Sequence, residues 1–202
     1  MLEIKELQQS DYSLAIDFAI KGMHFDRYID NKFFLKMYGR YFFYSELNRS
    51  TQIIAAYHDN ELQGVLLAAM KGENKRRRSK WRSLYVRIFD KLQNWFSKTG
   101  AGSYDQAIKE LLKQYKASTI PDGEICFLAT NPHSLKRGTG TILLNELIWR
   151  EKGKEVYLFT DDACTYQFYE HRDFNRFAEK KITMEFNSRQ VPLRCFLYNR
   201  KL

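Results

Sequence analysis

Hydrophobic and polar positions alternate at the start of the chain and then change to a helical period. Over residues 2–7 apolar and charged side chains alternate, which predicts a half-buried strand. Ser10 and Asp11 form an N-cap signal for a helix that runs to about Gly22. Residues 30–47 then carry apolar side chains at helical spacing and predict a second helix or a broken pair of helices, on the evidence of Phe33, Phe34, Met37, Tyr41 and Tyr44.

β-rich runs follow at residues 51–57 and 62–70, and the His-Asp-Asn-Glu segment between them predicts a hairpin turn. The second half of the chain predicts a strand, helix, strand and helix over residues 124–130, 139–152, 156–160 and 163–171. The last thirty residues predict two antiparallel strands. The expected order is therefore β-α-α-β-β, an insertion, and then β-α-β-α-β-β.

The insertion covers about residues 71–122 and has a helical pattern of its own. Apolar side chains recur there at steps of three and four, namely Trp81, Leu84, Tyr85, Ile88, Phe89, Leu92, Trp95 and Phe96. They predict an amphipathic helix whose other face is basic. A Gly-Ala-Gly-Ser break at residues 100–103 separates it from a second predicted helix over residues 104–117, and Pro121-Asp-Gly ends the excursion.

The 202 residues, 44% of them hydrophobic and 15% aromatic, are enough for one substantial core, so we expect a single domain over residues 1–202. Cys126, Cys164 and Cys195 lie far apart without a Cys-x-x-Cys pair, and the four histidines have no paired spacing, so neither a disulfide framework nor a metal site is expected. The first residues do not form a signal peptide, and no run approaches the ~20 apolar residues of a membrane span. A cytoplasmic location is expected.

The net charge of +9 is concentrated in the insertion. Residues 71–98 hold ten Lys and Arg residues against Glu73 and Asp90, a net charge of +8. The basic helix could pack its apolar face on the domain, which is the commonest outcome for such a helix, or bind a second subunit or another protein. Residues 75–98 could also bind an anionic membrane surface, an alternative that Trp81 and Trp95 keep open, whereas nucleic acid is not favoured.

Residues 128–144 run from a strand through a glycine-containing turn into a helix start. Gly138 and Gly140 free the backbone to bend, and the amides from about Arg137 to Ile142 are those of a first helical turn, which favours an anion. Lys136 adds charge beside Arg137. Such a turn can also exist only for tight packing. The segment lacks the Gly-Lys-Ser/Thr ending of a P-loop and the third glycine of a dinucleotide-binding turn, which argues against both classes.

Two segments resemble motifs of the GNAT family of N-acetyltransferases. Residues 124–144 resemble motif A, a strand followed by a Gln/Arg-x-x-Gly-x-Gly/Ala turn, with Thr130, Pro132, Leu135, Gly138 and Gly140 at the matching places. Residues 158–174 resemble motif B, in which a helix carries Phe-Tyr-Glu and a Gly-Phe pair follows. Here Phe168-Tyr169-Glu170 and Asp173-Phe174 stand at these places. The resemblance implies an α/β (α+β) GNAT acyl-CoA N-acyltransferase fold. Its sheet is mixed and mostly antiparallel, with flanking helices, and here a helical insertion lies between the third and fourth strands.

The resemblance also implies an activity, the transfer of an acetyl group from acetyl-CoA to an amine by direct attack. In the family the end of the fourth strand pairs with the pantetheine arm and supplies the oxyanion donor, and the following turn holds the pyrophosphate. The matching positions are Leu128, Ala129 and Thr130 for the strand and Leu135, Lys136, Arg137, Gly138, Thr139, Gly140 and Thr141 for the turn. Asp162 stands where many members have an asparagine and is expected to make a weaker contact.

Two residues are candidates for proton transfer. Tyr169 occupies the place of the family tyrosine that protonates the coenzyme A thiolate, although a tyrosine there could instead pack a helix on the sheet. Glu124, at the start of the fourth strand, is a candidate base for the incoming ammonium, and the alternative is a solvated carboxylate at a strand end. Three positions depart from the family pattern: Leu135 replaces Gln/Arg, Thr130 replaces valine and Asp173 replaces glycine.

The acceptor stays open among a small amine, an antibiotic, a peptide N-terminus and a lysine. Residues 22–48, with Phe25, Tyr28, Phe33 and Tyr41, and the insertion are expected to line its site. The competing class is a non-catalytic module that keeps the fold for acyl-CoA binding or for anchoring to a membrane or partner through the basic helix.

Overall fold

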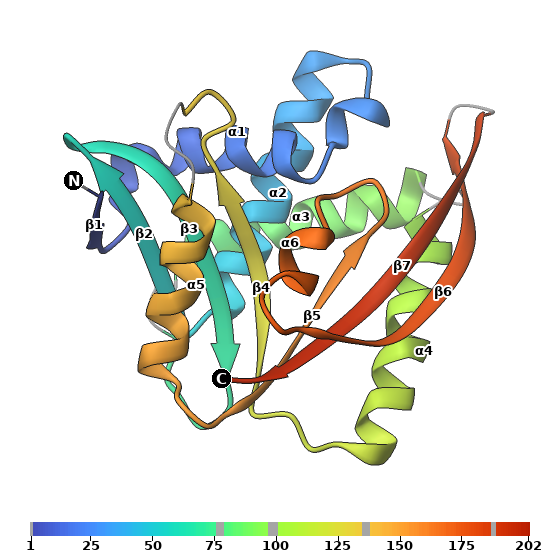
Figure 1. The fold of residues 1–202 in the computed structure, drawn as a ribbon. Helices are drawn as coiled ribbons and strands as arrows, with labels where there is room; N and C mark the ends of the chain where they lie inside the picture. Colours follow the sequence, from blue (N-terminus) through green and yellow to red (C-terminus); the bar gives the residue numbers. More distant parts are fainter. Residues whose placement is uncertain (1, 76–78, 97–100, 135–137, 187–188) are drawn as a thin grey trace.

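One seven-stranded sheet organises the chain (Figure 1). The computed structural model describes residues 2–75, 79–96, 101–134, 138–186 and 189–202. The strands are β1 (Leu2–Lys5), β2 (Gln52–His58), β3 (Glu61–Met70), β4 (Gly123–Thr130), β5 (Glu155–Asp161), β6 (Asn175–Phe186) and β7 (Arg189–Lys201). The helices are α1 (Tyr12–Gly22), α2 (Lys32–Arg49), α3 (Lys80–Phe96), α4 (Ala101–Ser118), α5 (Thr139–Arg150) and α6 (Gln167–Glu170), with single 3-10 turns at Gln9–Asp11 and Phe25–Arg27.

The sheet consists of two antiparallel halves joined by one short parallel contact. The strand order is β1-β2-β3-β4-β5-β7-β6, and only β4 and β5 are parallel. In the described residues these two strands pair only at Gly123 with Val156 and at Glu124 with Tyr157. Beyond these pairs β4 continues along β3, and β5 continues along β7. The backbone edges of β4 and β5 that face each other are therefore left without ladder partners over most of their length.

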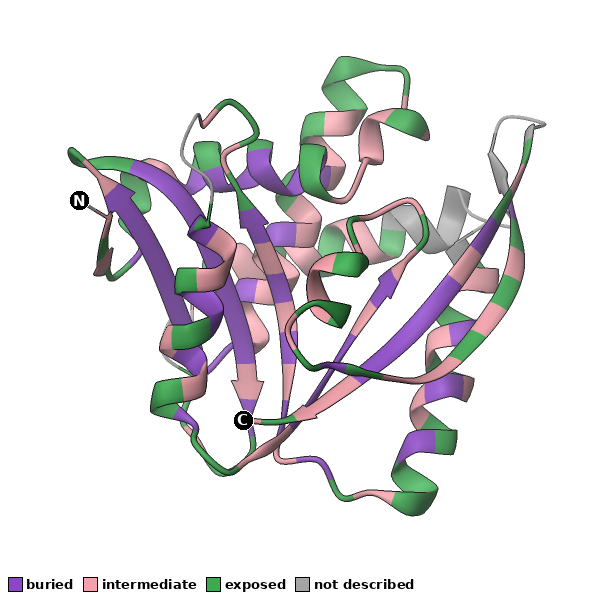
Figure 2. Cartoon of the chain, viewed as in Figure 1, coloured by how far each residue is buried: buried purple, intermediate pink, exposed green. Residues whose placement is uncertain are grey.

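Helices cover both faces of the sheet (Figures 1 and 2). On one face α1 and α2 pack on β2, β3 and β4, and α4 packs on β5, β6 and β7. On the other face α5 packs on β2, β3 and β4, while α6 lies over β7. A register shift at Cys126 interrupts the alternation of side chains along β4, so Phe127 faces α2 while Ile125, two residues earlier, faces α5.

The inserted helix α3 packs on α2 rather than on the sheet. Tyr41 of α2 stacks on Phe89 with ring centroids 4.5 Å apart, and its hydroxyl donates to Asp90 at 2.6 Å. Tyr85 meets Tyr44 edge to face at 5.8 Å and donates to the Met37 carbonyl at 3.0 Å. The aromatic periodicity of residues 30–47 thus serves two interfaces, one with the sheet and one with the insertion.

The predicted order of elements and the mixed, mostly antiparallel sheet are confirmed, with three local differences. Asp11 does not cap α1 through its side chain, because the carboxylate accepts the Tyr57 hydroxyl at 2.8 Å. Helix α4 begins at Ala101, before the predicted start. The helix predicted over residues 163–171 is wrong in length, since α6 spans only Gln167–Glu170. The Asp161 carboxylate accepts the amides of Ala163 and Cys164 and holds that stretch in a turn.

Among the helices that the structure describes, none combines the length and the apolar character needed to cross a lipid bilayer.

Candidate active site

The turn between β4 and α5 ends in a left-handed glycine at the helix start. Gly138 has φ 95°, in the region that side chains disfavour, and a Cβ there would meet no atom of the described residues within 4 Å. The first bond of the helix runs from the Ile142 amide to the Gly138 carbonyl at 3.0 Å. The amides of Thr139, Gly140 and Thr141 precede that bond and belong to the first helical turn, where amides have no partner within the helix. The chain therefore presents a set of donors suited to an anion.

Gly140 also has a packing role, the alternative that the sequence left open for this turn. A Cβ at this position would lie 3.1 Å from Cε2 of Phe168 and 3.8 Å from Cγ2 of Thr130. The missing side chain makes room for the Phe168 ring, so Gly140 lets α6 approach the start of α5, while its amide stays one of the first-turn donors.

Arg172 is a cation beside the same helix start that sequence reasoning missed. Its Nε donates to the Thr141 hydroxyl at 3.1 Å, and its Nη2 also donates there. Its Nη1 donates to the Phe168 carbonyl at 2.9 Å, and the guanidinium carbon lies 3.8 Å from the centroid of the Phe168 ring. In the sequence Arg172 is a single arginine shortly after the Phe-Tyr-Glu segment, with no pattern that marks it as a binding residue. The fold brings it next to the start of α5.

The strand end that leads to this turn carries Leu128, Ala129 and Thr130, which are half-buried, buried and exposed in that order. The register with β3 skips Cys126, because Leu67 pairs with Phe127 and Ala68 with Ile125. An extra residue of this kind bends a strand and changes its direction next to many active sites. Leu135, Lys136 and Arg137, also predicted to bind the pyrophosphate, lie outside the described residues.

Thr139 and Gly64 fix where the helix start lies on the sheet. A Cβ at Gly64 of β3 would lie 3.0 Å from Leu143 Cδ1 and 3.1 Å from Thr139 Cγ2, so a side chain there would push α5 away by a few tenths of an ångström. The Thr139 side chain is buried, and its Oγ1 has no hydrogen-bond partner within the described part of the chain. A buried hydroxyl without a partner is uncommon in a folded protein and is consistent with a site that a polar ligand completes.

Tyr169 lies in α6, on the α5 face of the sheet. Its ring packs against Phe168, Phe174 and Tyr198 with centroids 5.2, 5.5 and 6.3 Å away. Burial raises the pKa of the Tyr169 phenol, so the phenol stays protonated at neutral pH. Asp173, which replaces the family glycine, has φ 57°, the left-handed conformation that a glycine would adopt without strain.

Glu124 lies on the opposite face, at the last pair between β4 and β5, in a network of charges. Its two carboxylate oxygens accept Nη1 and Nη2 of Arg49 at 2.7 and 2.8 Å, and the Tyr157 hydroxyl donates to it at 3.1 Å. Arg49 also binds Glu46, with Nε and Nη2 at 2.7 and 2.6 Å from one carboxylate oxygen. Two carboxylates thus share one guanidinium, and sequence reasoning missed both Arg49 and Glu46.

Burial raises the pKa of Glu46 to about 7, against the opposing effect of Arg49. Burial raises the pKa of the neighbouring Cys126 thiol as well, which keeps that thiol neutral. Glu46 is therefore able to gain or lose a proton close to neutral pH, beside Arg49.

A second group of polar residues lies at the end of β5. Burial raises the pKa of Asp161, and its carboxylate accepts two backbone amides. Burial and, next, the charge of Asp161 raise the pKa of Tyr28 from the α1–α2 connection and of Tyr104 from α4. Asp162 points elsewhere, because its carboxylate accepts the amide and Nε of Arg194 at 2.9 and 3.0 Å.

The other aromatic residues expected near an acceptor have different positions. Phe25 packs edge to face on Tyr38 and Phe42, and Tyr41 is part of the α2–α3 interface described above. Phe33 is exposed at the start of α2. Of the four residues named from the sequence, Tyr28 is the one that the structure brings close to Asp161.

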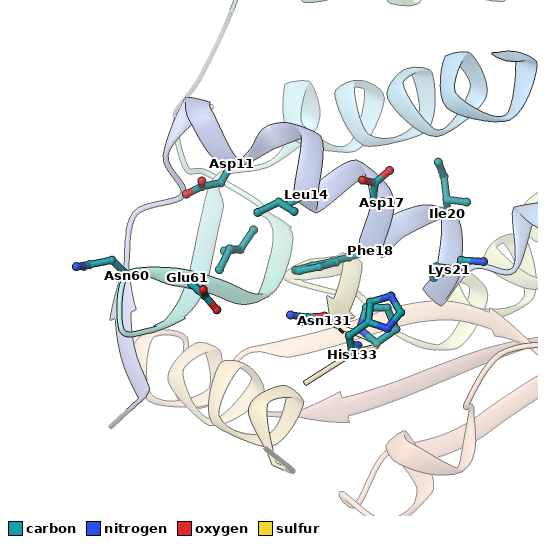
Figure 3. Close-up of a pocket in the computed structure, with 12 residues that line it drawn as sticks. Asp11, Leu14, Asp17, Phe18, Ile20, Lys21, Asn60, Glu61, Asn131 and His133 are labelled. Atoms are coloured by element: carbon teal, nitrogen blue, oxygen red, sulfur yellow. Dashed lines mark hydrogen bonds between the residues drawn. The ribbon is translucent and has the colours of Figure 1, made fainter. Parts of the chain in front are cut away.

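A surface pocket of about 710 Å³ lies beside the helix-start turn, between α1, the β2–β3 turn and the segment after β4 (Figure 3). Asp11, Asp17 and Glu61 supply carboxylates to its walls, and Asn131 and His133 form part of its rim. Lys21 is paired there with Asp26 at 2.7 Å. A wall rich in carboxylates repels a pyrophosphate, so the start of α5 fits that anion better than this pocket does.

Within the described residues no group of three or more His, Cys, Asp or Glu side chains is arranged to hold a metal ion. The three cysteines are free thiols.

Comparison with known proteins shows similarity in fold. No protein-family model matches the sequence, and a search of curated proteins finds no match. Many solved structures match essentially the whole chain, among them the following three. An acetyltransferase assigned to the GNAT family, from Desulfovibrio desulfuricans, is 12% identical with a TM-score of 0.53 and covers 100% of this chain and 99% of its own.

The PaiA N-acetyltransferase of Thermoplasma acidophilum in complex with coenzyme A is 15% identical with a TM-score of 0.53, covering 100% of this chain and 99% of its own. NAA60 of Arabidopsis thaliana in complex with a bisubstrate analogue is 13% identical with a TM-score of 0.52, covering 100% and 98%. The chain therefore has the fold of the GNAT acetyltransferases.

Proposed function

We propose that this protein is an N-acetyltransferase, which moves an acetyl group from acetyl-CoA to an amine by direct attack. One observation carries the proposal: β4 and β5 separate after Glu124 and Tyr157, and the separated end of β4 leads into the start of α5 at Gly138. An unpaired strand edge suits an extended amide-bearing arm, and a helix start suits a pyrophosphate. Solved structures with this fold include one with coenzyme A bound.

The residues at the start of α5 fit the pyrophosphate of acetyl-CoA. The amides of Thr139, Gly140 and Thr141 would donate to it, and the Arg172 guanidinium beside Thr141 would balance its charge. Leu128, Ala129 and Thr130 would pair with the pantetheine arm through their backbone. Lys136 and Arg137 remain proposed contacts from the same turn.

Tyr169 is the proposed acid. In the transfer the amine nitrogen forms a bond to the acetyl carbon, the carbon–sulfur bond breaks, and the departing thiolate takes the phenolic proton. The nitrogen loses its surplus proton to solvent as the amide forms, and the phenolate regains a proton from solvent. Burial raises the pKa of Tyr169, which keeps the phenol protonated until the thiolate forms. Tyr169 also comes from the α5 face, where the carrier is proposed to bind.

Glu124 is the proposed base, acting directly or through a water molecule. Arg49 holds the Glu124 carboxylate through two hydrogen bonds, and Glu46 competes for the same guanidinium. We assign Arg49 and Glu46 a positioning role, because both act on the reaction through Glu124. Glu124 therefore takes the proton of the ammonium within a network in which Glu46 and Glu124 share the single guanidinium of Arg49.

The acceptor is proposed to approach from the face of α2 and α4. Asp161, with Tyr28 and Tyr104 nearby, offers a negative charge between aromatic rings, which suits a cationic amine. The fold is shared with a structure in complex with a bisubstrate analogue, so a small-molecule or peptide amine is the proposed acceptor class.

Thiol release from acetyl-CoA in the presence of a panel of amines tests the proposal. The panel should contain polyamines, amino sugars, free amino acids, peptides with different N-termini and lysine peptides, and mass spectrometry should show a gain of one acetyl group. An enzyme gives thiol release that depends on one class of amine. If acetyl-CoA binds in calorimetry and no amine raises thiol release, the non-catalytic acyl-CoA-binding module is the better account.

Two glycines allow a controlled test of the donor site. Gly138 and Gly153 both have positive φ, 95° and 83°, and a Cβ at either would meet nothing within 4 Å in the part of the chain that the structure describes. Each Gly→Ala change should therefore lower the free energy of unfolding by a similar ~1 kcal/mol, through backbone strain alone. Only Gly138→Ala should also weaken acetyl-CoA binding, because Gly153 lies at the far end of α5. Equal affinities for the two variants would contradict the proposed pyrophosphate site.

A further inference from the structure

Helix α3 has an apolar face wider than the surface that covers it. Tyr85 and Phe89, on one part of that face, pack against α2, and hydrogen bonds from Tyr85 and to Asp90 hold the helix there. The helix is therefore a fixed part of the fold, and its orientation on α2 is set by specific contacts.

The remaining part of the apolar face points away from the protein. Trp81, Leu84 and Ile88 are 81%, 45% and 51% exposed. Their spacing of three and four residues places them in one stripe along the helix, next to Tyr85 and Phe89. No described residue covers this stripe. Three large apolar side chains aligned on one helix differ from the single exposed apolar residues that protein surfaces commonly carry.

A row of cations runs along the other side of the stripe. Lys80, Arg87 and Lys91 are exposed, and at ~100° per residue they fall within about 40° of one another on the helix, adjacent to Leu84. They belong to the segment 71–98, whose net charge is +8. The uncovered surface thus combines an apolar stripe with a cationic border.

The combination selects among the surfaces that could cover it. A second copy of the chain would bring two segments of +8 together and is opposed by their repulsion. Nucleic acid would use the cations and leave Trp81, Leu84 and Ile88 in water. An anionic lipid surface satisfies both parts, because apolar side chains enter the acyl boundary while Lys and Arg remain at the phosphate groups.

We propose that the face of α3 formed by Trp81, Leu84 and Ile88, with Lys80, Arg87 and Lys91 beside it, docks on an anionic membrane surface. The protein binds there peripherally, with α3 lying along the interface. Since α3 lies on α2, and α5 with Arg172 lies on the other face of the sheet, docking leaves the proposed acetyl-CoA site in water (Figure 1).

Vesicle co-sedimentation of the full chain tests the proposal. Vesicles of phosphatidylcholine alone are compared with vesicles that also contain phosphatidylserine, at low and at physiological salt. The chain is expected to sediment with the anionic vesicles and to dissociate progressively as salt rises. Absence of binding to anionic vesicles at low salt would overturn the proposal.

Two matched tryptophan variants separate docking from general stickiness. Trp81→Ala should lower the vesicle partition coefficient about tenfold, because it removes the largest side chain of the stripe. Trp149→Ala, at a residue 77% exposed on α5 and away from α3, should leave the partition coefficient unchanged. Thermal unfolding of both variants checks that neither has lost the fold.

The remaining outcomes decide against the proposal. Equal partition coefficients for the two variants would mean that the chain binds through charge alone and that the stripe is not in the interface. Sedimentation equilibrium provides the second check: a dimer that Trp81→Ala dissociates would assign the stripe to a contact between copies. Arg87→Glu should weaken anionic binding more than it weakens any binding to neutral vesicles, and the reverse result would also contradict the proposal.

Discussion

The two faces of the sheet near the β4–β5 divergence are built in different ways. On the α5 face the described part of the site consists of backbone amides, a left-handed glycine, packed aromatic rings and the cation Arg172. On the α2 face it consists of carboxylates that share Arg49, and of phenols near Asp161. The first face suits an anionic carrier and the second a cationic acceptor. Substitutions on the first should mainly change acetyl-CoA affinity and thiol departure, and those on the second should mainly change stability and pH dependence.

The largest effect is expected on the α5 face, from Tyr169→Phe. The change removes only the hydroxyl, so the ring contacts with Phe174 and Tyr198 are kept. General acids typically contribute about 100-fold or more to a rate, and kcat for thiol release should fall by about that factor while acetyl-CoA affinity stays the same. Tyr166→Phe, also in this aromatic cluster, is the control and should retain its rate. An unchanged kcat for Tyr169→Phe would remove the acid assignment.

Arg49→Met tests the α2 face, where we expect the main effect on stability. It leaves Glu46 and Glu124 without their shared cation. Removing one partner of a fully buried pair costs ~3–5 kcal/mol, and since the Arg49 side chain is 37% exposed we expect a loss of about 2 kcal/mol in unfolding free energy. Arg150→Met, which breaks an i,i+4 pair with Glu146, should cost about 0.5 kcal/mol or less. Denaturant unfolding measures both, and equal losses would contradict the network.

Arg172→Gln should act on affinity rather than on rate. Loss of the cation beside Thr141 is expected to weaken acetyl-CoA binding about tenfold, or ~1.4 kcal/mol, and to make binding less sensitive to salt. Arg200→Gln removes another cation near Phe174 and should change affinity much less. Calorimetric titration at two salt concentrations measures the acetyl-CoA affinity of both variants and its salt dependence. A tenfold loss for both variants would indicate a general effect of charge and not a contact at the helix start.

Glu46→Gln tests the α2 face through the pH dependence of the unfolding free energy. Because burial raises the pKa of Glu46 to about 7, the folded protein binds this proton more tightly than the unfolded chain does. The stability that this proton provides is fully present at pH 4 and is lost as pH rises to about 7. The unfolding free energy of the wild type should therefore fall relative to that of Glu46→Gln across this window. A constant difference from pH 5 to pH 8 would show that Glu46 is ionised throughout.

The smallest effect is expected from Asp173→Gly. Asp173 has φ 57°, and glycine adopts that conformation without strain, so the variant should be more stable by roughly 0.5 kcal/mol. The gain should be visible in denaturant unfolding without a change in acetyl-CoA affinity. A loss of stability would mean that the 3.8 Å contact between Asp173 and Arg200 outweighs the backbone strain.

The order of strand, turn and helix on the α5 face could be predicted from the sequence, because it depends on local backbone chemistry. A glycine with positive φ, a strand that ends before it and a helix that starts after it are all properties of residues 124–144. The Phe-Tyr-Glu segment was placed correctly in α6, although the helix is shorter than its periodicity predicted. There the side chain of Asp161 binds two amides that a longer helix would have used.

The contacts of the α2 face could not be predicted in the same way, because they join residues far apart in the chain. Arg49 and Glu124 are separated by 75 positions, and neither carries a pattern that points to the other. Arg172 and Gly64 were missed for a similar reason, since each acts on α5 only after the sheet has formed. The helix of the insertion was predicted by its period, whereas the part of its apolar face that α2 leaves uncovered follows from tertiary packing.

Amide hydrogen exchange with and without acetyl-CoA tests the central claim most directly. If acetyl-CoA binds along the separated edge of β4 and on the start of α5, exchange should slow at residues 125–130 and 139–142, and the segment around Tyr169 should also be protected. The pocket formed by Asp11, Asp17 and Glu61 should keep its exchange rates. Protection of that pocket without protection of residues 139–142, or no protection at saturating acetyl-CoA, would contradict the account.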